Sequence, residues 1–425
     1  MIKVSIPYEK SKLDFAVPKM NLCEILEPNR VSLPENEEEE IERAIDNPVG
    51  SKKLEKIVKP GDKVIIICED IARLTPVDRI LPLLLNRLNE IGVTDENIKI
   101  VMALGSHRPM SSTEMIRKVG ENVFKRVKVV NSEFKDKAKL VDLGLAPGGV
   151  RVWVDRQVME GDIRIGVGSI APHAAAGYTG GGKIVYPGIV GEETVAQFHL
   201  RRAFLSQSVL GIVENAVRLE MEKWVDTVGL DFIVNVVITP ENKIYKVVTG
   251  HYVKAHRIGV KYSQEVYGVR ANEKVDIAVV SSFSADQDFW QGTKGIISGE
   301  LIVRDGGTLI LVTPCFEGVG PHKNYPKYIG DDDPDSLLKT ATENLMDPKE
   351  ILSLAVALPV ARIRKRLRLV SLISKGINSE EAKEAKFERF NTINEALQEG
   401  LSYYGKEAKV SVIPCGGESC PYFGK

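Results

Sequence analysis

A lysine placed directly after three glycines is the most chemically suggestive feature of the sequence. Residues 170–199 read IAPHAAAGYTGGGKIVYPGIVGEETVAQFH, and almost no bulky side chains precede Lys183 in this stretch. Glycines permit backbone paths closed to other residues, and a lysine at the end of such a path supplies a charge or a nucleophile. The stretch also holds His173 and His199, two of the six histidines of the chain. We therefore interpret it as part of a ligand site.

A phosphate-binding loop is the first chemistry that this pattern suggests. Gly177 to Lys183 satisfies G-x-x-x-x-G-K, which would make the protein a nucleotide-dependent ATPase or kinase. Such a loop needs Ser or Thr at the next position to hold magnesium, and this chain has Ile184 there. Pro187 and Gly188 then oppose the helix that should follow. The phosphate-binding loop is therefore kept only as an alternative.

Histidines provide the second candidate chemistry. His107 and His173 both follow apolar runs and lie beside small or polar residues rather than in an apolar face. Two imidazoles can act as acid and base on opposite faces of one substrate, and a third, such as His199, can bind a metal. Each histidine taken alone is explained equally well by a structural role. We expect that role for the remaining three, His251, His256 and His322.

Two cations in separate parts of the chain form a third candidate group. Arg73 lies in EDIARLTP and Lys294 in FWQGTKG. If a cleft between two domains brought them together, both could hold one small carboxylate, Arg73 through its two-pronged guanidinium. The alternative is that both are ordinary surface cations.

Alternating strands and helices predict how these loops are positioned. The run GDKVIIIC (61–68) is typical of a strand buried on both faces, and IKIVMAL (98–104) and VKVVNS (127–132) repeat the pattern. Residues 81–92 have helical apolar spacing and a glycine stop, and Ser111 with Glu114 has the spacing of a capping box. The alternation predicts an α/β fold, in which ligands bind at loops after the carboxyl ends of strands. Residues 69–76 and 105–110 are two such loops.

Length and composition limit the remaining possibilities. A chain of 425 residues predicts two or three domains, and VDIAVVSS (275–282) begins a second one near residue 273. With 57 basic and 58 acidic residues, bulk charge argues against a nucleic-acid or anionic-membrane partner. No apolar run reaches membrane-spanning length and no signal peptide is recognisable, so we expect a cytoplasmic protein. Cys415 and Cys420 lack two further nearby zinc ligands, and their role and the oligomeric state stay open.

Five motifs together carry a resemblance to a known family. They are D-x-x-R-x-T-P (Asp70 to Pro76), A-L-G-S-H-R-P-M (Ala103 to Met110), P-H-x-x-x-G-Y-T-G-G-G-K (Pro172 to Lys183), the spaced His199, and W-Q-G-T-K (Trp290 to Lys294). In this order, over about residues 60 to 300, the chain resembles the nickel-dependent lactate racemase family. The glycine–lysine segment with its histidines is the specific part of the match.

The resemblance implies a cofactor and a reaction. In that family a nickel pincer nucleotide, a pyridinium mononucleotide that carries nickel through two sulfurs and a carbon, is attached covalently to the lysine matching Lys183. His199 would complete the nickel coordination. His107 and His173 would exchange the hydroxyl proton while a hydride moves between the substrate carbon and the cofactor. Because the 2-keto acid formed is planar, hydride return to either face racemises the substrate.

The resemblance also implies substrate and cofactor contacts and a domain plan. Substrate would be held by Arg73, Gln291 and Lys294, and the nucleotide would be lined by Asp70, Thr75, Gly180, Gly181 and Gly182. The implied fold has two α/β domains with the active site in the cleft: a cofactor-binding domain of residues 1–270, completed by a C-terminal strand within 405–425, and a second domain of residues 273–400.

Three departures from the family pattern concern the substrate. Ala72 replaces a frequent Thr, Gly182 replaces a residue that more often has a side chain, and residues 340–400 lack the tryptophan that lactate racemases have there. The expected substrate is therefore lactate or a related 2-hydroxy acid. Protein made in a host without the cofactor pathway is expected to be an apoprotein. A non-catalytic sugar-acid or nucleotide-binding protein that kept the cleft is the remaining alternative.

Overall fold

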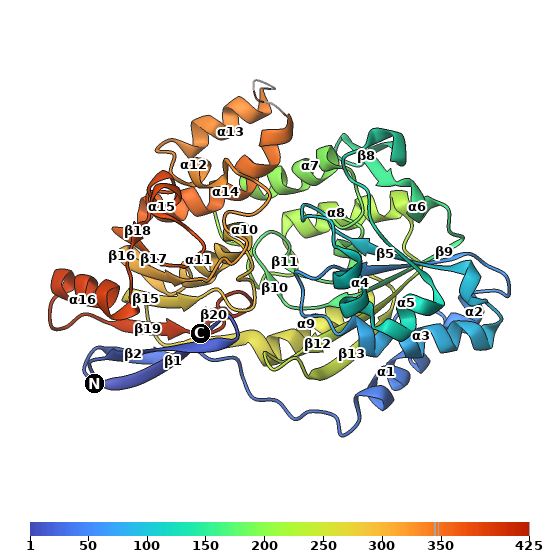
Figure 1. The fold of residues 1–425 in the computed structure, drawn as a ribbon, viewed down its shortest axis with the longest axis horizontal. Coiled ribbons are helices and arrows are strands. Elements are labelled where there is room, and N and C mark those ends of the chain that lie inside the picture. Colours follow the sequence, from blue (N-terminus) through green and yellow to red (C-terminus); the bar gives the residue numbers. More distant parts are fainter. Residues whose placement is uncertain (344–345, 347, 425) are drawn as a thin grey trace. The chain divides into compact units, whose positions relative to one another are not determined.

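The computed structural model describes residues 1–343, 346 and 348–424, and these form two compact units (Figure 1). Unit 1 comprises Met1–Asn29, His199–Gly211 and Tyr267–Lys425, and unit 2 comprises Arg30–Phe198 and Ile212–Val266. Both units contain a largely parallel sheet with helices, so the α/β fold class predicted from the sequence is confirmed.

The sheet of unit 2 carries the loops that the sequence singled out. Its strand order is β13-β12-β9-β4-β5-β6, and every neighbouring pair is parallel except β12 with β13. Its strands are β4 (Val64–Glu69), β5 (Ile98–Ala103), β6 (Lys128–Asn131), β9 (Ile163–Ser169), β12 (Phe232–Ile238) and β13 (Ile244–Gly250). Two short antiparallel pairs accompany it: β7 (Leu140–Ala146) with β8 (Val150–Asp155), and β10 (Pro172–His173) with β11 (Gly177–Tyr178).

Helices of unit 2 pack their apolar faces on this sheet. In α3 (Val77–Ile91), six apolar side chains at helical spacing are buried, and a fully buried leucine contributes roughly 1.5–3 kcal/mol relative to an exposed one. Gly92 ends α3 in the left-handed conformation, and Ser111 and Glu114 form the expected capping box at the start of α4 (Ser112–Val119). The other helices are α1 (Glu37–Asp46), α2 (Leu54–Ile57), α5 (Glu121–Arg126), α6 (Arg156–Met159), α8 (Ala216–Val228) and α9 (Lys254–Tyr267), with 3₁₀ turns η1 (Asp95–Asn97), η2 (Lys137–Lys139) and η3 (Gly181–Ile184).

The sheet of unit 1 is parallel throughout, with the order β18-β17-β16-β15-β19-β3. Its strands are β3 (Leu22–Ile25), β15 (Val275–Ser281), β16 (Val303–Val312), β17 (Leu369–Ile373), β18 (Glu388–Arg389) and β19 (Val410–Ile413). The hairpin of β1 (Ile2–Tyr8) and β2 (Ser11–Val17) shares an apolar core with this sheet, and β14 (Gly268–Ala271) pairs with β20 (Cys420–Phe423). The helices are α10 (Phe289–Gly292), α11 (Lys294–Gly299), α12 (Tyr325–Ile329), α13 (Pro334–Thr342), α14 (Pro348–Arg366), α15 (Ser379–Glu384) and α16 (Ile393–Tyr404).

The units differ from the domain boundaries expected from the sequence. Residues 1–29 belong with residues 267–425, because β3 pairs with β19 and the β1–β2 hairpin packs on the same sheet. The C-terminal strand β19 lies between β15 and β3, so it completes the sheet of unit 1 rather than the domain that carries Lys183. Helix α7 (Glu192–Ala203) starts in unit 2 and ends in unit 1.

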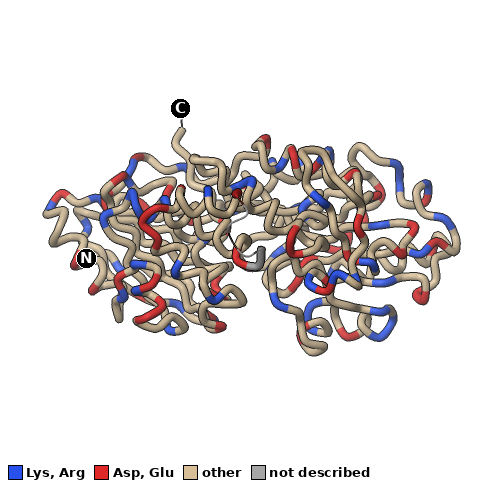
Figure 2. The backbone as a smooth tube through the Cα atoms, turned by 90° about the horizontal axis from the view of Figure 1, so that it is seen from above, with Lys and Arg blue, Asp and Glu red and all other residues tan. Residues whose placement is uncertain are grey.

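Lys and Arg are interspersed with Asp and Glu over the whole backbone trace (Figure 2). Among the described residues, no helix combines the length and the apolar character needed to cross a membrane.

Candidate active site

Three loops of unit 2 leave neighbouring strands at the same edge of the sheet. Strands β9, β4 and β5 are adjacent and parallel, and they end at Ser169, Glu69 and Ala103. The loops that follow carry Asp70 and Arg73 after β4, His107 after β5, and the glycine–lysine segment after β9. The expected placement of these loops at the carboxyl ends of parallel strands is therefore confirmed.

Asp70 and His107 form a carboxylate–imidazole pair between two of these loops. Oδ2 of Asp70 lies 2.6 Å from Nδ1 of His107, and the Asp70 side chain is buried. Burial by itself would raise the pKa of Asp70, but the charge and hydrogen bond of His107 hold that pKa below its ordinary value. The ionised carboxylate accepts the hydrogen bond, so Nδ1 of His107 carries a proton, and whenever the ring is neutral Nε2 carries the lone pair.

His173 is held in the opposite tautomer. It lies in the short strand β10, and its buried ring accepts hydrogen bonds at Nδ1 from the backbone N–H groups of Ala175 and Ala176, at 3.1 and 3.3 Å. Both partners can only donate, so in the neutral ring the proton is on Nε2. His107 therefore presents an acceptor at Nε2, whereas His173 presents a donor.

Lys183 lies in the 3₁₀ turn η3 and is partly buried. Burial lowers the pKa of its amine to about 7, and the positive charge of Arg73 acts in the same direction, whereas Glu69 and Asp70 oppose it. At neutral pH a large fraction of this amine is therefore uncharged, which is the form that acts as a nucleophile.

The loop after β4 is fixed by groups that the sequence did not reveal. The buried ammonium of Lys118, on α4, donates hydrogen bonds to the backbone carbonyls of Arg73 and Thr75, at 2.7 and 2.9 Å. The Thr75 hydroxyl donates to the Glu69 carboxylate, and that carboxylate also accepts the backbone N–H of Ser169 at 2.9 Å. These contacts tie the loop that carries Arg73 to the end of β9.

The glycines before Lys183 are small because protein fills the space behind them. A Cβ on Gly180 would come within 2.9 Å of Asn235 Oδ1, and one on Gly182 within 2.7 Å of Val225. Gly181 is equally crowded, against the backbone oxygen of Tyr252 at 2.8 Å, and both Gly180 and Gly181 have positive φ. Packing inside unit 2 thus explains these glycines, and their expected contact with a nucleotide stays a prediction.

A phosphate-binding loop is not formed at Lys183. The residue is followed by turns rather than by a helix, and α7 begins only at Glu192. The helix N-terminus that would bind phosphate after the lysine is therefore missing in this described segment. The sequence alternative of an ATPase or kinase has no support here.

The other predicted site residues lie in unit 1. His199 is on the part of α7 that belongs to this unit, and Gln291 and Lys294 lie on α10 and α11. The Lys294 ammonium donates a hydrogen bond to Oε1 of the buried Gln291, whose own backbone N–H is bonded to the Asp288 carboxylate at 2.8 Å. Gln291 and Lys294 are thus held together, and both their predicted contact with substrate and their expected meeting with Arg73 across a cleft stay predictions.

Sequence reasoning missed several residues that support this edge. Asn235 interrupts the apolar strand FIVNVVI, a signal that could have marked it, and its Oδ1 accepts the N–H of Gly181 at 2.7 Å. Arg218 and Glu222 have the i, i+4 spacing of an exposed helical ion pair, yet both are buried. His256 was expected to be structural, and it is completely buried beneath the glycines, with Nε2 2.9 Å from the Thr179 carbonyl oxygen.

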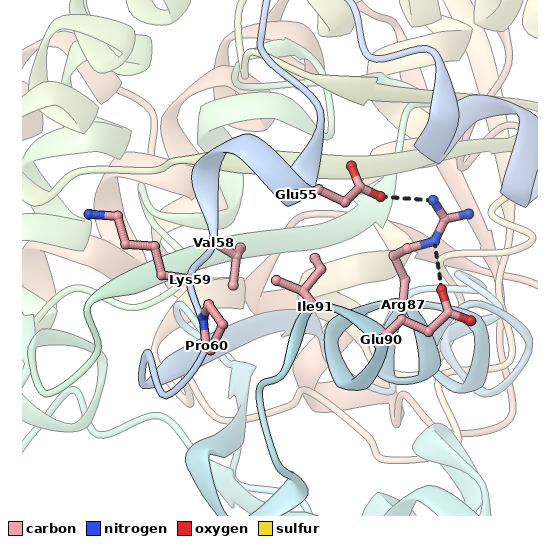
Figure 3. Close-up of a pocket in the computed structure, with 7 residues that line it drawn as sticks. All are labelled: Glu55, Val58, Lys59, Pro60, Arg87, Glu90 and Ile91. Atoms are coloured by element: carbon pink, nitrogen blue, oxygen red, sulfur yellow. Dashed lines mark hydrogen bonds and ion pairs between the residues drawn. The ribbon is translucent and has the colours of Figure 1, made fainter.

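Two other features are separate from this edge. A pocket of about 380 Å³ is lined by Glu55, Val58, Lys59, Pro60, Arg87, Glu90 and Ile91, and it contains none of the predicted site residues (Figure 3). Within the described ranges, no group of three or more His, Cys, Asp or Glu side chains is arranged to hold a metal ion. Cys415 is a buried free cysteine, and Cys420 is a half-buried one.

The fold and the loop contacts define an α/β protein whose candidate site residues stand on loops at one edge of a parallel sheet. Comparison with known proteins then identifies the family. Residues 8–211 match the model of the lactate racemase N-terminal domain, and residues 270–418 match that of the lactate racemase C-terminal domain. The chain belongs to the lactate racemase family, and it is an isomerase.

Two curated relatives are similar over nearly the whole chain. The lactate racemase of Lactiplantibacillus plantarum is 29% identical over 422 residues, covering 98% of this chain and 99% of the relative. The lactate racemase of Thermoanaerobacterium thermosaccharolyticum is 30% identical over 427 residues, covering 98% of each.

Two solved structures are similar in fold. The lactate racemase apoprotein from Thermoanaerobacterium thermosaccharolyticum has a TM-score of 0.87 at 29% identity, covering 99% of this chain and 100% of that one. A Thermotoga maritima protein has a TM-score of 0.71 at 21% identity, covering 93% and 100%, and shows the shared fold alone.

Proposed function

We propose that the protein racemises lactate or a closely related 2-hydroxy acid in the cytoplasm, with a nickel pincer nucleotide attached to Lys183. Family membership supports the reaction. The observation that carries the cofactor assignment is the partly buried Lys183, whose amine has a pKa of about 7 at the edge that also holds the Asp70–His107 pair.

The residues present fit such a group. An amine that is largely uncharged at neutral pH is suited to hold the nucleotide covalently. The imidazole of His199 would supply a protein ligand to the nickel that the nucleotide carries. When bound, the nucleotide would supply a reversible acceptor for the hydride of the substrate carbon.

The histidines have distinct tasks in this proposal. His107 takes the hydroxyl proton at Nε2, and the imidazolium that forms is stabilised by the ionised Asp70 at its Nδ1 side. His173 donates a hydrogen bond from Nε2, because its Nδ1 already accepts two backbone N–H groups. Arg73, Gln291 and Lys294 are assigned to the substrate carboxylate and oxygen.

Intact-mass and metal measurements test the attachment. Protein made in cells that supply the cofactor should gain the mass of the nucleotide on Lys183 and hold stoichiometric nickel, whereas a Lys183→Met variant should do neither. Active wild-type protein without added mass or nickel would refute the proposal.

Chirality measurements test the reaction. Loaded enzyme should convert single-enantiomer lactate, or another hydroxy acid in a panel, to a racemate in deuterium oxide while the carbon-bound hydrogen is retained. Extensive deuterium incorporation at that carbon would instead indicate carbanion exchange. A protein that binds hydroxy acids with unchanged affinity in its His107→Ala and His173→Ala variants, and never turns them over, would be a binding protein.

A further inference from the structure

Arg218 is a completely buried cation whose hydrogen bonds go to the glycine loop. From α8, its Nε and Nη1 donate to the carbonyl oxygens of Ala176 and Gly180, at 3.1 and 3.3 Å. Its Nη2 donates to the carbonyl of Tyr178. One guanidinium thus joins three carbonyls of the segment that leads from His173 to Lys183.

Two other buried side chains hold the remaining polar groups of this segment. Nη1 of Arg257 can only donate and lies 3.0 Å from Nδ1 of His256, so Nε2 of His256 carries the proton and donates to the Thr179 carbonyl at 2.9 Å. Asn235 accepts the N–H of Gly181. Side chains of α8, α9 and β12 therefore hold the backbone of residues 176–181 through hydrogen bonds.

A buried cation would be unusual at position 218 if the side chain only filled space in the core. Arg218 shares Glu222, at 3.5 Å, with Arg257, which lies 2.7 Å from Glu222 and also pairs with Glu214 at 2.6 Å. A buried ion pair gives little net stability compared with apolar side chains of similar volume. A guanidinium at this place is explained by the three carbonyls, which an apolar side chain could not satisfy.

We propose that Arg218 is a positioning residue, which holds residues 173–183 in the conformation that presents His173 and the Lys183 amine before any cofactor is bound. Burial lowers the pKa of Lys183, Arg73 and Arg218 lower it further, and Glu69 and Asp70 oppose them, so the test separates the loss of the Arg218 charge from the loss of its hydrogen bonds. The link to cofactor attachment rests on the proposed function, whereas the hold on residues 173–183 does not.

The test uses apoproteins and the acylation of Lys183 by N-hydroxysuccinimidyl acetate. In this reaction the acetyl group passes to the amine, and N-hydroxysuccinimide and a proton leave. Peptide mass spectrometry follows the rate between pH 6 and 10, and hydrogen exchange follows the amides of residues 174–182. The variants are Arg218→Met, Arg218→Lys and, as a matched control, Arg364→Met. Arg364 likewise donates to two backbone carbonyls, those of Ile329 and Asp331, but in unit 1.

We expect Arg218→Met to speed exchange at residues 174–182 and to slow acylation at pH 7 by about threefold or more, because the segment that presents the amine is no longer held in one conformation. Arg218→Lys keeps the charge but cannot span three carbonyls, so it should behave as Arg218→Met does in both measurements. A full return of the acylation rate with exchange still fast would show that charge and not position sets the rate, and would overturn the inference. Arg364→Met should match the wild type in both. If Arg218→Met lowers only thermal stability, with acylation and exchange as in wild type, the inference is wrong.

A second variant and one further measurement keep the outcomes distinct. If Arg218→Met does not fold, the Arg218→Met/Glu222→Gln double variant, which removes both charges, is measured in its place and judged by the same criteria. Cofactor loading, read as mass on Lys183 in cells that supply the cofactor, should be slower in Arg218→Met than in wild type. Loading that is absent in wild type refutes the proposed function and leaves the apoprotein result standing, whereas equal loading with unchanged acylation refutes the role of Arg218.

Discussion

The carboxylate of Asp70 and Nδ1 of His107 lie 2.6 Å apart, so a buried acid on the loop after β4 orients the imidazole on the loop after β5. The resemblance implies that Asp70 also lines the nucleotide, which stays a prediction. Its hydrogen bond supports a role in setting the tautomer of His107 and stabilising its protonated form.

Replacement of Asp70 by Asn should lower kcat about 100-fold in loaded enzyme, because the amide cannot stabilise an imidazolium and can favour the wrong tautomer. Nickel content should stay at the wild-type level. Asp95→Asn is the matched control. It removes a carboxylate that pairs with Arg126 and accepts a hydrogen bond from Asn89. Racemisation rates at saturating substrate measure the effect, and a loss shared by both variants would contradict the role of Asp70.

Glutamine at each histidine should separate the two tautomers. A side-chain amide can donate a hydrogen bond as Nε2–H of His173 does, but it cannot take up a proton as Nε2 of His107 does. His107→Gln should therefore lose about 10² to 10⁴ in kcat, whereas His173→Gln should lose about tenfold. If the two variants lost the same factor in kcat, whichever enantiomer is the substrate, the two rings would exchange protons alike.

Lys183→Met should stabilise the apoprotein most at low pH. The folded amine has a pKa of about 7 against an ordinary 10.5, so between these values the unfolded chain binds more protons and wild-type stability rises with pH. Below pH 7 the folded protein must hold a partly buried charge that methionine lacks. Urea unfolding at pH 6.5, 8 and 9.5 should show an advantage for the variant that shrinks with pH. Lys223→Met, at an exposed position of α8, is the control for removal of a lysine charge.

Gly177→Ala should destabilise unit 2 more than Gly149→Ala. Both glycines have positive φ, 75° and 77°, so the backbone strain is matched. A Cβ on Gly177 would lie 1.9 Å from the carbonyl oxygen of Ile212, whereas one on Gly149 meets nothing within 4 Å. We expect a difference of about 2 kcal/mol in the free energy of unfolding, measured by denaturant titration. Equal effects would mean that the segment after Gly211 moves aside at little cost.

Local pattern was enough to predict much of unit 2. The apolar runs at 61–68 and 98–104 became adjacent parallel strands, and the capping box at Ser111 and the glycine stop at Gly92 are both present. The motif residues Asp70, Arg73, His107, His173 and Lys183 fall on loops of one sheet edge because parallel strands fix where those loops emerge.

Long-range pairing could not be predicted in the same way. Nothing in the local pattern of Leu22–Ile25 indicates that it pairs with Val410–Ile413, and for that reason the two units divide the N-terminal segment differently from the domains expected from the sequence. Arg218 and Lys118 were missed because charged residues on helices usually face solvent, and only the fold shows that their partners are backbone carbonyls.

The pairing of β3 with β19 sets the order in which the two units can be finished during synthesis. Unit 2 has all its residues once position 266 has left the ribosome, whereas the sheet of unit 1 lacks the strand that receives β3 until residues 410–413 emerge. Domains fold as units as the chain appears. The loops that hold Lys183 and both proposed proton-handling histidines therefore have their complete scaffold about 150 residues before the unit that contains Gln291 and Lys294 can close its sheet.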